Sequence, residues 1–326
     1  MNIVQKINLW RRIGRDYTLS QSFLPYLLAF VMATKVCQVN YFLSMLGLIG
    51  VVLVQMSMNM MDDYFDWKSG SVAEYKKLLD EGMKARSHKC FYLINSSVSI
   101  NQLLFAALFL DFVAGVFGLI IALNVGWHVV AIALFAGVLG VCYSAPYIKL
   151  GQRGFGEISI GIIFGPLLMM GAYITAGANV DFTMLYTSIF VGVMVASLAF
   201  GHSIMDFDSD KNVGKVTLPV ALGSRKKSAL VLGLAFVFSY LMVLIGLIKG
   251  IYPMPVLLVF LTLPRAFGVL KIMNTDTREK KFWMGVMENW KMHQEEGSDW
   301  FMLRFFSIRN TVNDFLILLT LAFLLS

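Results

Sequence analysis

Residues 41–66 read YFLSMLGLIGVVLVQMSMNMMDDYFD, an apolar run that ends abruptly in carboxylates. The run 41–61 has the length and apolar content of a helix that crosses the hydrocarbon core of a bilayer, which takes ~20 residues. Asp62, Asp63 and Asp66 follow it directly. The stretch therefore predicts a membrane helix that carries an acidic cluster at one end.

The composition of the whole chain agrees with this interpretation. Of 326 residues, 58% are hydrophobic and 14% are charged, and the mean hydropathy is +0.71. Soluble domains carry about 45–50% apolar and about 25% charged residues. These values exclude a water-soluble enzyme, a disordered protein and a secreted disulfide scaffold. Three cysteines without metal-ligand spacing indicate neither a disulfide framework nor a cysteine metal site.

The hydropathy pattern predicts an all-α integral membrane protein with about nine transmembrane helices in one bundle around an intramembrane cavity. No Pro-rich or Gly/Ser-rich linker divides the chain, so a single domain, 1–326, is expected. The first 18 residues are polar and basic, and no cleavable signal is expected before the first span. The nine predicted spans are 19–37, 41–61, 100–124, 127–143, 157–177, 183–205, 228–249, 253–272 and 309–326.

The basic residues are distributed unevenly between the two sides of these spans. Of the 27 Lys and Arg residues, all but Lys35 and Lys249 fall on the side of the N-terminus. The positive-inside rule then predicts a cytoplasmic N-terminus, an external C-terminus and an active site that opens to the cytoplasm. We attribute the net charge of +7 to this orientation in the inner membrane and expect no nucleic-acid partner.

The polar segment 274–308 contains many aromatic residues mixed with Lys and Arg. This mixture is typical of a helix that lies in the membrane interface. An ordinary cytoplasmic loop explains it equally well, and both alternatives stay open. Arg265, within the span 253–272, either faces a polar cavity or extends to the interface.

The first acidic cluster has a spacing that suits a helix face. Asn59, Asp62, Asp63 and Asp66 stand at i, i+3, i+4 and i+7. Carboxylates crowded on one face repel each other, and a hard divalent cation resolves that conflict. Mg²⁺ commonly joins protein carboxylates to substrate phosphates, which makes it the expected cofactor.

A second cluster follows the span 183–205. His202, Asp206 and Asp210 are expected on one helical stripe, with Asp208 pointing elsewhere. Both clusters fall at cytoplasmic helix ends, so the pattern favours a site for Mg²⁺ and a diphosphate over two solvated helix ends. Lys68, Lys211 and Lys215 are placed to supply positive charge to phosphate oxygens, or serve only to orient the spans.

Four local motifs, in order, carry a resemblance to a known family. They are Arg15-Asp-Tyr-Thr18-Leu19 with Pro25, Asp62-Asp63-Tyr64-Phe65-Asp66 with Gly70, the run from Tyr143 to Glu157 followed by Phe164-Gly165-Pro166, and Asp206-Phe-Asp208-Ser209-Asp210 with Gly214 to Pro219 and Leu222-Gly223. With these motifs the chain resembles the UbiA-type intramembrane prenyltransferases over about 15–272. It looks most like the branch that prenylates 1,4-dihydroxy-2-naphthoate in menaquinone biosynthesis.

The resemblance implies Mg²⁺-dependent transfer of a prenyl chain from a polyprenyl diphosphate to an aromatic acceptor. The metal ligands that it implies are Asp62, Asp66, Asp206, Asp210 and, as an auxiliary, Asn59. The catalytic and substrate contacts that it implies are Asp63, Lys149, Arg153, Lys215, Tyr143, Lys68, Arg15 and Tyr64. The chain departs from the family pattern at Asp62, His202, Ser203 and Met205, which puts the acceptor in question more than the diphosphate chemistry.

Three alternatives to this function remain. Other acceptors of the family are 4-hydroxybenzoate, homogentisate and a glycerol phosphate lipid. An ion-coupled transporter also uses intramembrane acids, but its acids usually lie near the bilayer midplane, and here they cluster at one surface. A CDP-alcohol phosphotransferase is disfavoured because its compact Asp-Gly-x-x-Ala-Arg motif is not found.

Overall fold

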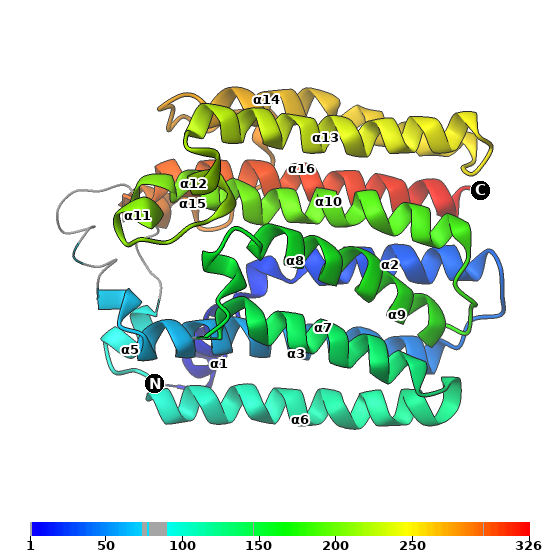
Figure 1. Ribbon diagram of the computed structural model, residues 1–326, viewed down its shortest axis with the longest axis horizontal. Helices are drawn as coiled ribbons and strands as arrows, with labels where there is room; N and C mark the ends of the chain where they lie inside the picture. Colours follow the sequence, from blue (N-terminus) through cyan, green and yellow to red (C-terminus); the bar gives the residue numbers. More distant parts are fainter. Residues whose placement is uncertain (1, 74–76, 78–89, 146, 296) are drawn as a thin grey trace. The chain divides into compact units, whose positions relative to one another are not determined.

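The computed structural model describes residues 2–73, 77, 90–145, 147–295 and 297–326 (Figure 1). These residues form helices, and within them the only β-type pairing is a single bridge between Arg153 and Val216. The chain divides into two compact units. Unit 1 comprises the described parts of Met1–Ala73, His88–Lys149 and Leu167–Met184, and unit 2 those of Glu74–Ser87, Leu150–Pro166 and Leu185–Ser326.

Unit 1 is built on long apolar helices. Its elements are α1 (Ile3–Ile13), η1 (Asp16–Thr18), α2 (Ser20–Thr34), α3 (Tyr41–Lys68), α5 (Phe91–Ile94), α6 (Ile100–Val125), α7 (His128–Ser144) and α9 (Leu168–Thr175). α3 and α6 lie side by side (Figure 1), and α2 packs against both α3 and α9. A capping box in which Ser99 and Gln102 satisfy each other's backbone N–H groups fixes the start of α6.

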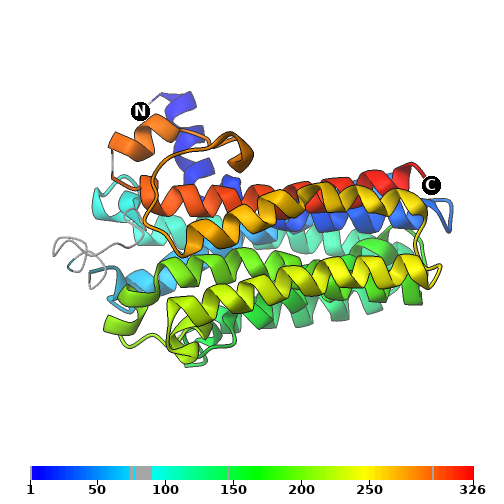
Figure 2. The same cartoon turned by 90° about the horizontal axis from the view of Figure 1, so that it is seen from above.

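Unit 2 contains the remaining helices. They are η2 (Leu150–Gln152), α8 (Gly156–Ile162), the π-helical turn η3 (Ile163–Leu167), α10 (Phe182–Met205), α11 (Phe207–Asn212), α12 (Leu218–Leu222), α13 (Arg225–Ile248), η4 (Met254–Thr262), α14 (Leu263–Met273), η5 (Phe282–Met284), α15 (Trp290–Glu295) and α16 (Asp299–Leu324). η3 and α10 cross the boundary with unit 1 at their ends. Figure 2 shows η4 and α14 running alongside α16, which they contact. Phe190 of α10 packs edge-on against Phe315 of α16.

Seven of the described helices are long and apolar enough to cross a bilayer. They are α3, the run α8–η3–α9, α6, α10, α13, the run η4–α14 and α16. The other two predicted spans correspond to α2, with 15 residues, and α7, with 17, both shorter than the usual ~20. The all-helical membrane fold is confirmed, and the number nine stays a prediction.

The surface of α6 indicates contact with lipid. Phe105, Phe112 and Leu123 are each at least 70% exposed although the helix is strongly apolar. A soluble protein rarely leaves so many large apolar side chains together in water. The same residues are well placed in a bilayer, which supports the membrane assignment.

The segment 274–308 contains the start of the last helix. α16 begins at Asp299, ten residues before the predicted span, and its first turns bury Trp300, Phe301, Phe305 and Phe306 inside the protein. Neighbouring elements of the chain cover these four rings, whereas Phe282 of the same segment is fully exposed. The choice between an interfacial helix and a cytoplasmic loop stays a prediction.

Two side chains of α16 hold this preceding segment. Arg304 is 1% exposed and donates to the carbonyl oxygens of Thr275 and Thr277. The Asn310 amide donates to the carbonyl oxygens of Met284 and Val286, both at 2.8 Å. The buried polar groups of α16 thus satisfy backbone carbonyls that have no helical partner.

Glycines allow η3 and α10 to approach closely in unit 2. A Cβ at Gly165 would stand 2.5 Å from both the Cα of Gly192 and the carbonyl oxygen of Ser188. Backbone atoms on a facing helix cannot yield to a methyl group as a side-chain tip can. Gly165 is therefore expected to be needed for this contact.

We expect Gly165→Ala to lower the free energy of unfolding by about 1–3 kcal/mol, the usual cost of overpacking. Gly115→Ala on α6 is the matched control, because a Cβ there meets nothing within 4 Å. Alanine should leave stability at Gly115 equal or slightly higher, owing to its better helix propensity. Thermal unfolding of both variants in detergent measures the effect, and equal midpoints would refute the close-contact argument.

Candidate active site

The first acidic motif lies at the end of α3, where Arg15 joins two of its carboxylates. The guanidinium Nη2 of Arg15 donates to Asp62 at 3.1 Å and also to Asp63. The Arg15 side chain is 13% exposed and that of Asp63 is 4% exposed. Arg15 therefore already compensates part of the repulsion that the sequence assigned to a cation.

The turn before α2 sets the position of Arg15. Its backbone has a φ of 54°, in the left-handed region, and the Thr18 hydroxyl donates to its carbonyl oxygen at 2.7 Å. Asn59 of α3 donates through Nδ2 to the carbonyl oxygen of Gly14 at 2.9 Å. These bonds tie the turn to α3, so that Arg15 is held beside the motif.

Asp63 is the most enclosed acid of the first motif. It accepts from Arg15 and from the Tyr92 hydroxyl, the latter at 2.7 Å. Burial and then the Asp63 carboxylate raise the pKa of Tyr92, which keeps it a donor. Burial alone would lower the pKa of Arg15, but Asp63 and Asp62 hold it well above its ordinary value, so the guanidinium stays charged.

Asp62 is more accessible, with a side chain that is 20% exposed. Besides Arg15, it accepts from the Ser144 hydroxyl at 2.7 Å, which joins the end of α7 to the end of α3. Tyr143 precedes Ser144 on α7 and is partly buried. Lys149 follows in a left-handed conformation, with a φ of 48°.

The last turn of α3 holds the other predicted residues of this motif. Asp66 is 7% exposed, whereas Lys68 is exposed at the helix end. The Lys68 Nζ stands 6.0 Å from the centre of the Tyr64 ring, at the limit of a cation–π contact. Unit 1 thus gathers Arg15, Asp62 and Asp63 into one network and places Asp66 one turn further along α3.

The second motif, in unit 2, lies across the junction of two helices. α10 ends at Met205 and α11 begins at Phe207, so the helix is interrupted at Asp206, and His202 and Asp210 belong to different helices. The His202 ring stacks on Phe305, with centroids 4.6 Å apart. His202 thus packs at the α10–α16 contact, while backbone bonds from Asp206 N to the His202 oxygen at 3.0 Å and from Asp210 N to the Asp206 oxygen at 2.8 Å keep the one-turn spacing of the predicted stripe.

Asp210 and Lys215 form the ion pair of this motif. The Asp210 side chain is 3% exposed, and its carboxylate lies 3.6 Å from the Lys215 Nζ. Val216, the residue after Lys215, forms a β-bridge with Arg153. The Arg153 side chain is exposed. Asp208 is exposed and pairs with Arg225 at 3.0 Å, away from Asp210, as the spacing predicts.

Glu157 is predicted only as the last residue of the Tyr143–Glu157 motif, without a role of its own. It lies in the first turn of α8, is 6% exposed and lies within electrostatic range of Asp210. An acid at the start of a predicted span is itself a signal of function or pairing. Ser203, a departure from the family pattern, donates to the carbonyl oxygen of Ala199 at 3.3 Å.

The carboxylates of the two motifs provide hard oxygen ligands, the type that Mg²⁺ prefers. Within the described part of the chain, no three His, Cys, Asp or Glu side chains converge as a ready-made metal cluster. Mg²⁺ usually binds through one or two carboxylates and completes its coordination with water and substrate phosphates. Each motif by itself therefore offers donors that suit a cation arriving with a diphosphate.

A family model identifies the chain. The model of the UbiA prenyltransferase family matches residues 22–291. The chain belongs to this family. It is accordingly a prenyltransferase and a multi-pass integral membrane protein, and the transporter and phosphotransferase alternatives are set aside.

Individual relatives agree with this assignment. The 1,4-dihydroxy-2-naphthoate octaprenyltransferase of Bacillus subtilis is 25% identical over 268 residues, which cover 81% of each chain. The 2-carboxy-1,4-naphthoquinone phytyltransferase of Synechocystis is 32% identical over 145 residues, or 44% of this chain and 47% of that one. The structure of a UbiA homolog from Archaeoglobus fulgidus bound to GPP and Mg²⁺ has the same fold, with a TM-score of 0.63 at 14% identity over 93% of this chain and 99% of that chain.

Proposed function

We propose that this UbiA-family enzyme transfers a polyprenyl chain from its diphosphate to 1,4-dihydroxy-2-naphthoate, in a Mg²⁺-dependent reaction of menaquinone biosynthesis. The observation that carries the proposal is the acidic network at the end of α3, where Asp62 stays accessible while Asp63 anchors Arg15. The Bacillus subtilis relative, named as a naphthoate octaprenyltransferase, supports the acceptor.

The proposed metal ligands are Asp62, Asp66, Asp206 and Asp210. Mg²⁺ held there would supply positive charge to the diphosphate as the carbon–oxygen bond breaks. Asn59 is an auxiliary ligand, and its Nδ2 is engaged with Gly14, so its carbonyl oxygen is the atom available for this role. Arg15 is already bound to two carboxylates, so we assign it to orienting them rather than to gripping phosphate.

The remaining charged residues take the role of phosphate contacts. Lys68 is the last residue of α3, and Lys149, Arg153 and Lys215 follow the ends of α7, η2 and α11. Lysine binds phosphate as a point charge, and arginine binds it through a bidentate fork. These residues are proposed to stabilise the negative charge that accumulates on the leaving diphosphate.

The chemistry also requires protection of an allylic cation from water. Tyr64 and Tyr143, near the ends of α3 and α7, are proposed to present ring faces to the electron-poor carbon. The acceptor ring then bonds to that carbon while diphosphate leaves with the electron pair of the broken bond. Loss of a proton from the attacked ring carbon then restores the aromatic ring. With a dihydroxynaphthoate acceptor the carboxylate also leaves as CO₂, and a proton takes its place on the ring.

The enzyme is proposed to lie in the inner membrane with a cytoplasmic N-terminus and an active site on that side. The concentration of Lys and Arg on one side of the spans supports this orientation. A soluble acceptor such as dihydroxynaphthoate would reach such a site from the cytoplasm, while the prenyl chain stays in the bilayer.

An acceptor panel tests the function. Membranes that contain the enzyme, one labelled polyprenyl diphosphate and Mg²⁺ should form a labelled lipid with 1,4-dihydroxy-2-naphthoate. EDTA should abolish the product and excess Mg²⁺ should restore it, because the carboxylates lose their counter-ion. Product formed instead with 4-hydroxybenzoate, homogentisate or a glycerol phosphate lipid would refute the naphthoate assignment and identify another acceptor of the family.

A further inference from the structure

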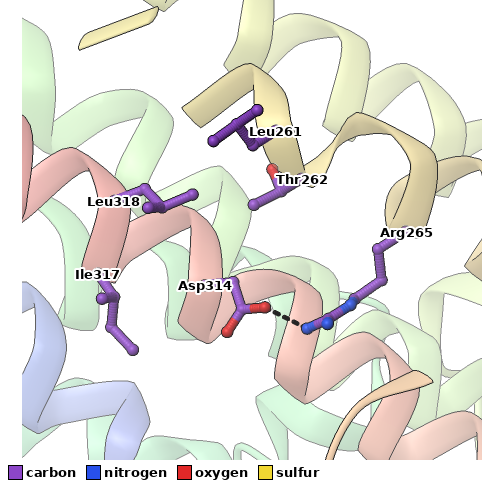
Figure 3. Close-up of a pocket in the computed structure, with 6 residues that line it drawn as sticks. All are labelled: Leu261, Thr262, Arg265, Asp314, Ile317 and Leu318. Carbon is purple, nitrogen blue, oxygen red and sulfur yellow. Dashed lines mark hydrogen bonds and ion pairs between the residues drawn. The ribbon is translucent and has the colours of Figure 1, made fainter. Parts of the chain in front are cut away.

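A cavity of about 270 Å³ in unit 2 lies between the run η4–α14 and α16. Figure 3 shows Asp314 of α16 and Arg265 of α14 pointing toward each other across it, with Thr262 at one wall. The apolar lining residues are Leu261, Ile317 and Leu318. The proposed prenyl-transfer chemistry uses none of these residues.

The charged pair of this cavity is only partly enclosed. Arg265 donates through Nη1 to the Asp314 carboxylate and, at 3.4 Å, to the carbonyl oxygen of Asn310. The side chains are 24% and 41% exposed. Within the described residues, no further hydrogen bond engages the other Asp314 oxygen or the Arg265 Nε and Nη2. Donors and an acceptor are thus left for a ligand.

The depth of the pair makes a polar ligand favourable. Arg265 lies near the middle of the run 254–273 and Asp314 near the middle of α16, both long enough to span a bilayer. Hydrocarbon offers no hydrogen bonds, and ionisable residues at such depth usually have a function or a partner. A molecule that brings polar groups to this depth is therefore stabilised there.

Charge and size narrow the class of ligand. The charges of Arg265 and Asp314 cancel. An anionic ligand would be repelled by Asp314, and a cationic ligand would be repelled by Arg265. A neutral molecule with hydroxyl or carbonyl groups satisfies both. The cavity volume suits a ring system and not a polyprenyl chain, whose length would have to extend along the apolar helix surface into lipid.

We propose that this cavity binds the ring of a neutral prenylated quinol or quinone, with Arg265 and Asp314 as the polar contacts. This inference rests on the proposed function, which makes a molecule of that class. The cavity would hold the product on its way into the bilayer, or sense its accumulation there.

Binding of a finished molecule tests the proposal without turnover. The probe is tritiated geranyl-naphthoquinone, added to the full-length enzyme in lipid nanodiscs, with empty nanodiscs to subtract partition into lipid. Ile317→Trp fills the cavity and should weaken saturable binding by about tenfold or more, which corresponds to 1.4 kcal/mol or more. Leu321→Trp, one turn along α16 and equally exposed at 42%, is the matched control and should bind as wild type does.

A second variant keeps the proposal testable if Ile317→Trp does not fold. Arg265→Leu with Asp314→Leu removes both charges together and should also weaken binding. Equal binding by wild type, Ile317→Trp and the double variant would overturn the proposal. Displacement by dioleoylglycerol as effective as by unlabelled quinone would overturn it too, since the site would then bind neutral lipid. Saturable binding without prenyl transfer in the acceptor panel would refute only the proposed function.

Discussion

Replacing Asp66 or Asp206 with alanine is expected to lower the rate of prenyl transfer by about 10²–10³ or more, the usual cost of removing one group that stabilises transition-state charge. Each variant loses a carboxylate proposed to hold Mg²⁺ against the diphosphate. Asp66 is 7% exposed and is therefore a buried carboxylate, not a freely solvated surface residue. The measurement is initial rate of labelled product at saturating Mg²⁺ and prenyl diphosphate.

Asp208→Ala provides the control within the same motif. Asp208 is exposed and paired with Arg225 at 3.0 Å, so its removal should leave most of the activity. Such exposed pairs contribute little to stability, about 0–1 kcal/mol. If Asp66→Ala or Asp206→Ala transferred prenyl groups at the wild-type rate while EDTA still inhibited it, the assignment of that residue as a metal ligand would be wrong.

Replacing Arg15 with leucine is expected to cost about 3–5 kcal/mol of stability, the typical result of removing one partner from a buried ion pair. The Asp63 carboxylate, 3% exposed, would keep Tyr92 as a donor but lose its counter-charge. The free energy of unfolding in detergent, without substrate, measures the effect. If Arg15 served only to bind phosphate, its replacement would leave the free energy of unfolding unchanged.

Two further variants test whether the buried ion pair of Arg15 stabilises the fold. Arg11→Leu removes a pair with Asp16 in which the side chains are 63% and 31% exposed, so stability should change by about 0–1 kcal/mol. The double variant Arg15→Leu with Asp63→Leu should recover part of the loss, because no uncompensated buried charge remains. Equal stabilities of Arg11→Leu and Arg15→Leu would contradict the buried network.

The sequence located the acidic ends of two helices correctly, because a long apolar run followed directly by carboxylates is typical of a membrane helix that ends at the bilayer surface. It also indicated that Asp208 lies apart from Asp210. The partners of these acids were beyond its reach. Tyr92 and Ser144 lie 29 and 82 residues from the aspartates they contact, and nothing in the local pattern of either signals the pairing.

The segment before the last helix shows a second limit of the sequence. Aromatic and basic residues in 299–308 suit a membrane interface as well as a protein interior, since rings and guanidinium groups are at home in both. In the structure Arg304 is buried and contacts the carbonyl groups of Thr275 and Thr277. Such a choice depends on which backbone groups lack a partner, and only the packed chain defines those.

By itself the sequence determined the membrane class, the family and the two acidic motifs, because apolar runs and short polar motifs are local properties. Only the tertiary structure decided that Arg15 pairs with both Asp62 and Asp63, that α10 gives way to α11 at Asp206, and that Arg265 pairs with Asp314 across a cavity. Contacts between residues far apart in the chain depend on how helices pack, and side-chain spacing along one helix carries no record of that packing.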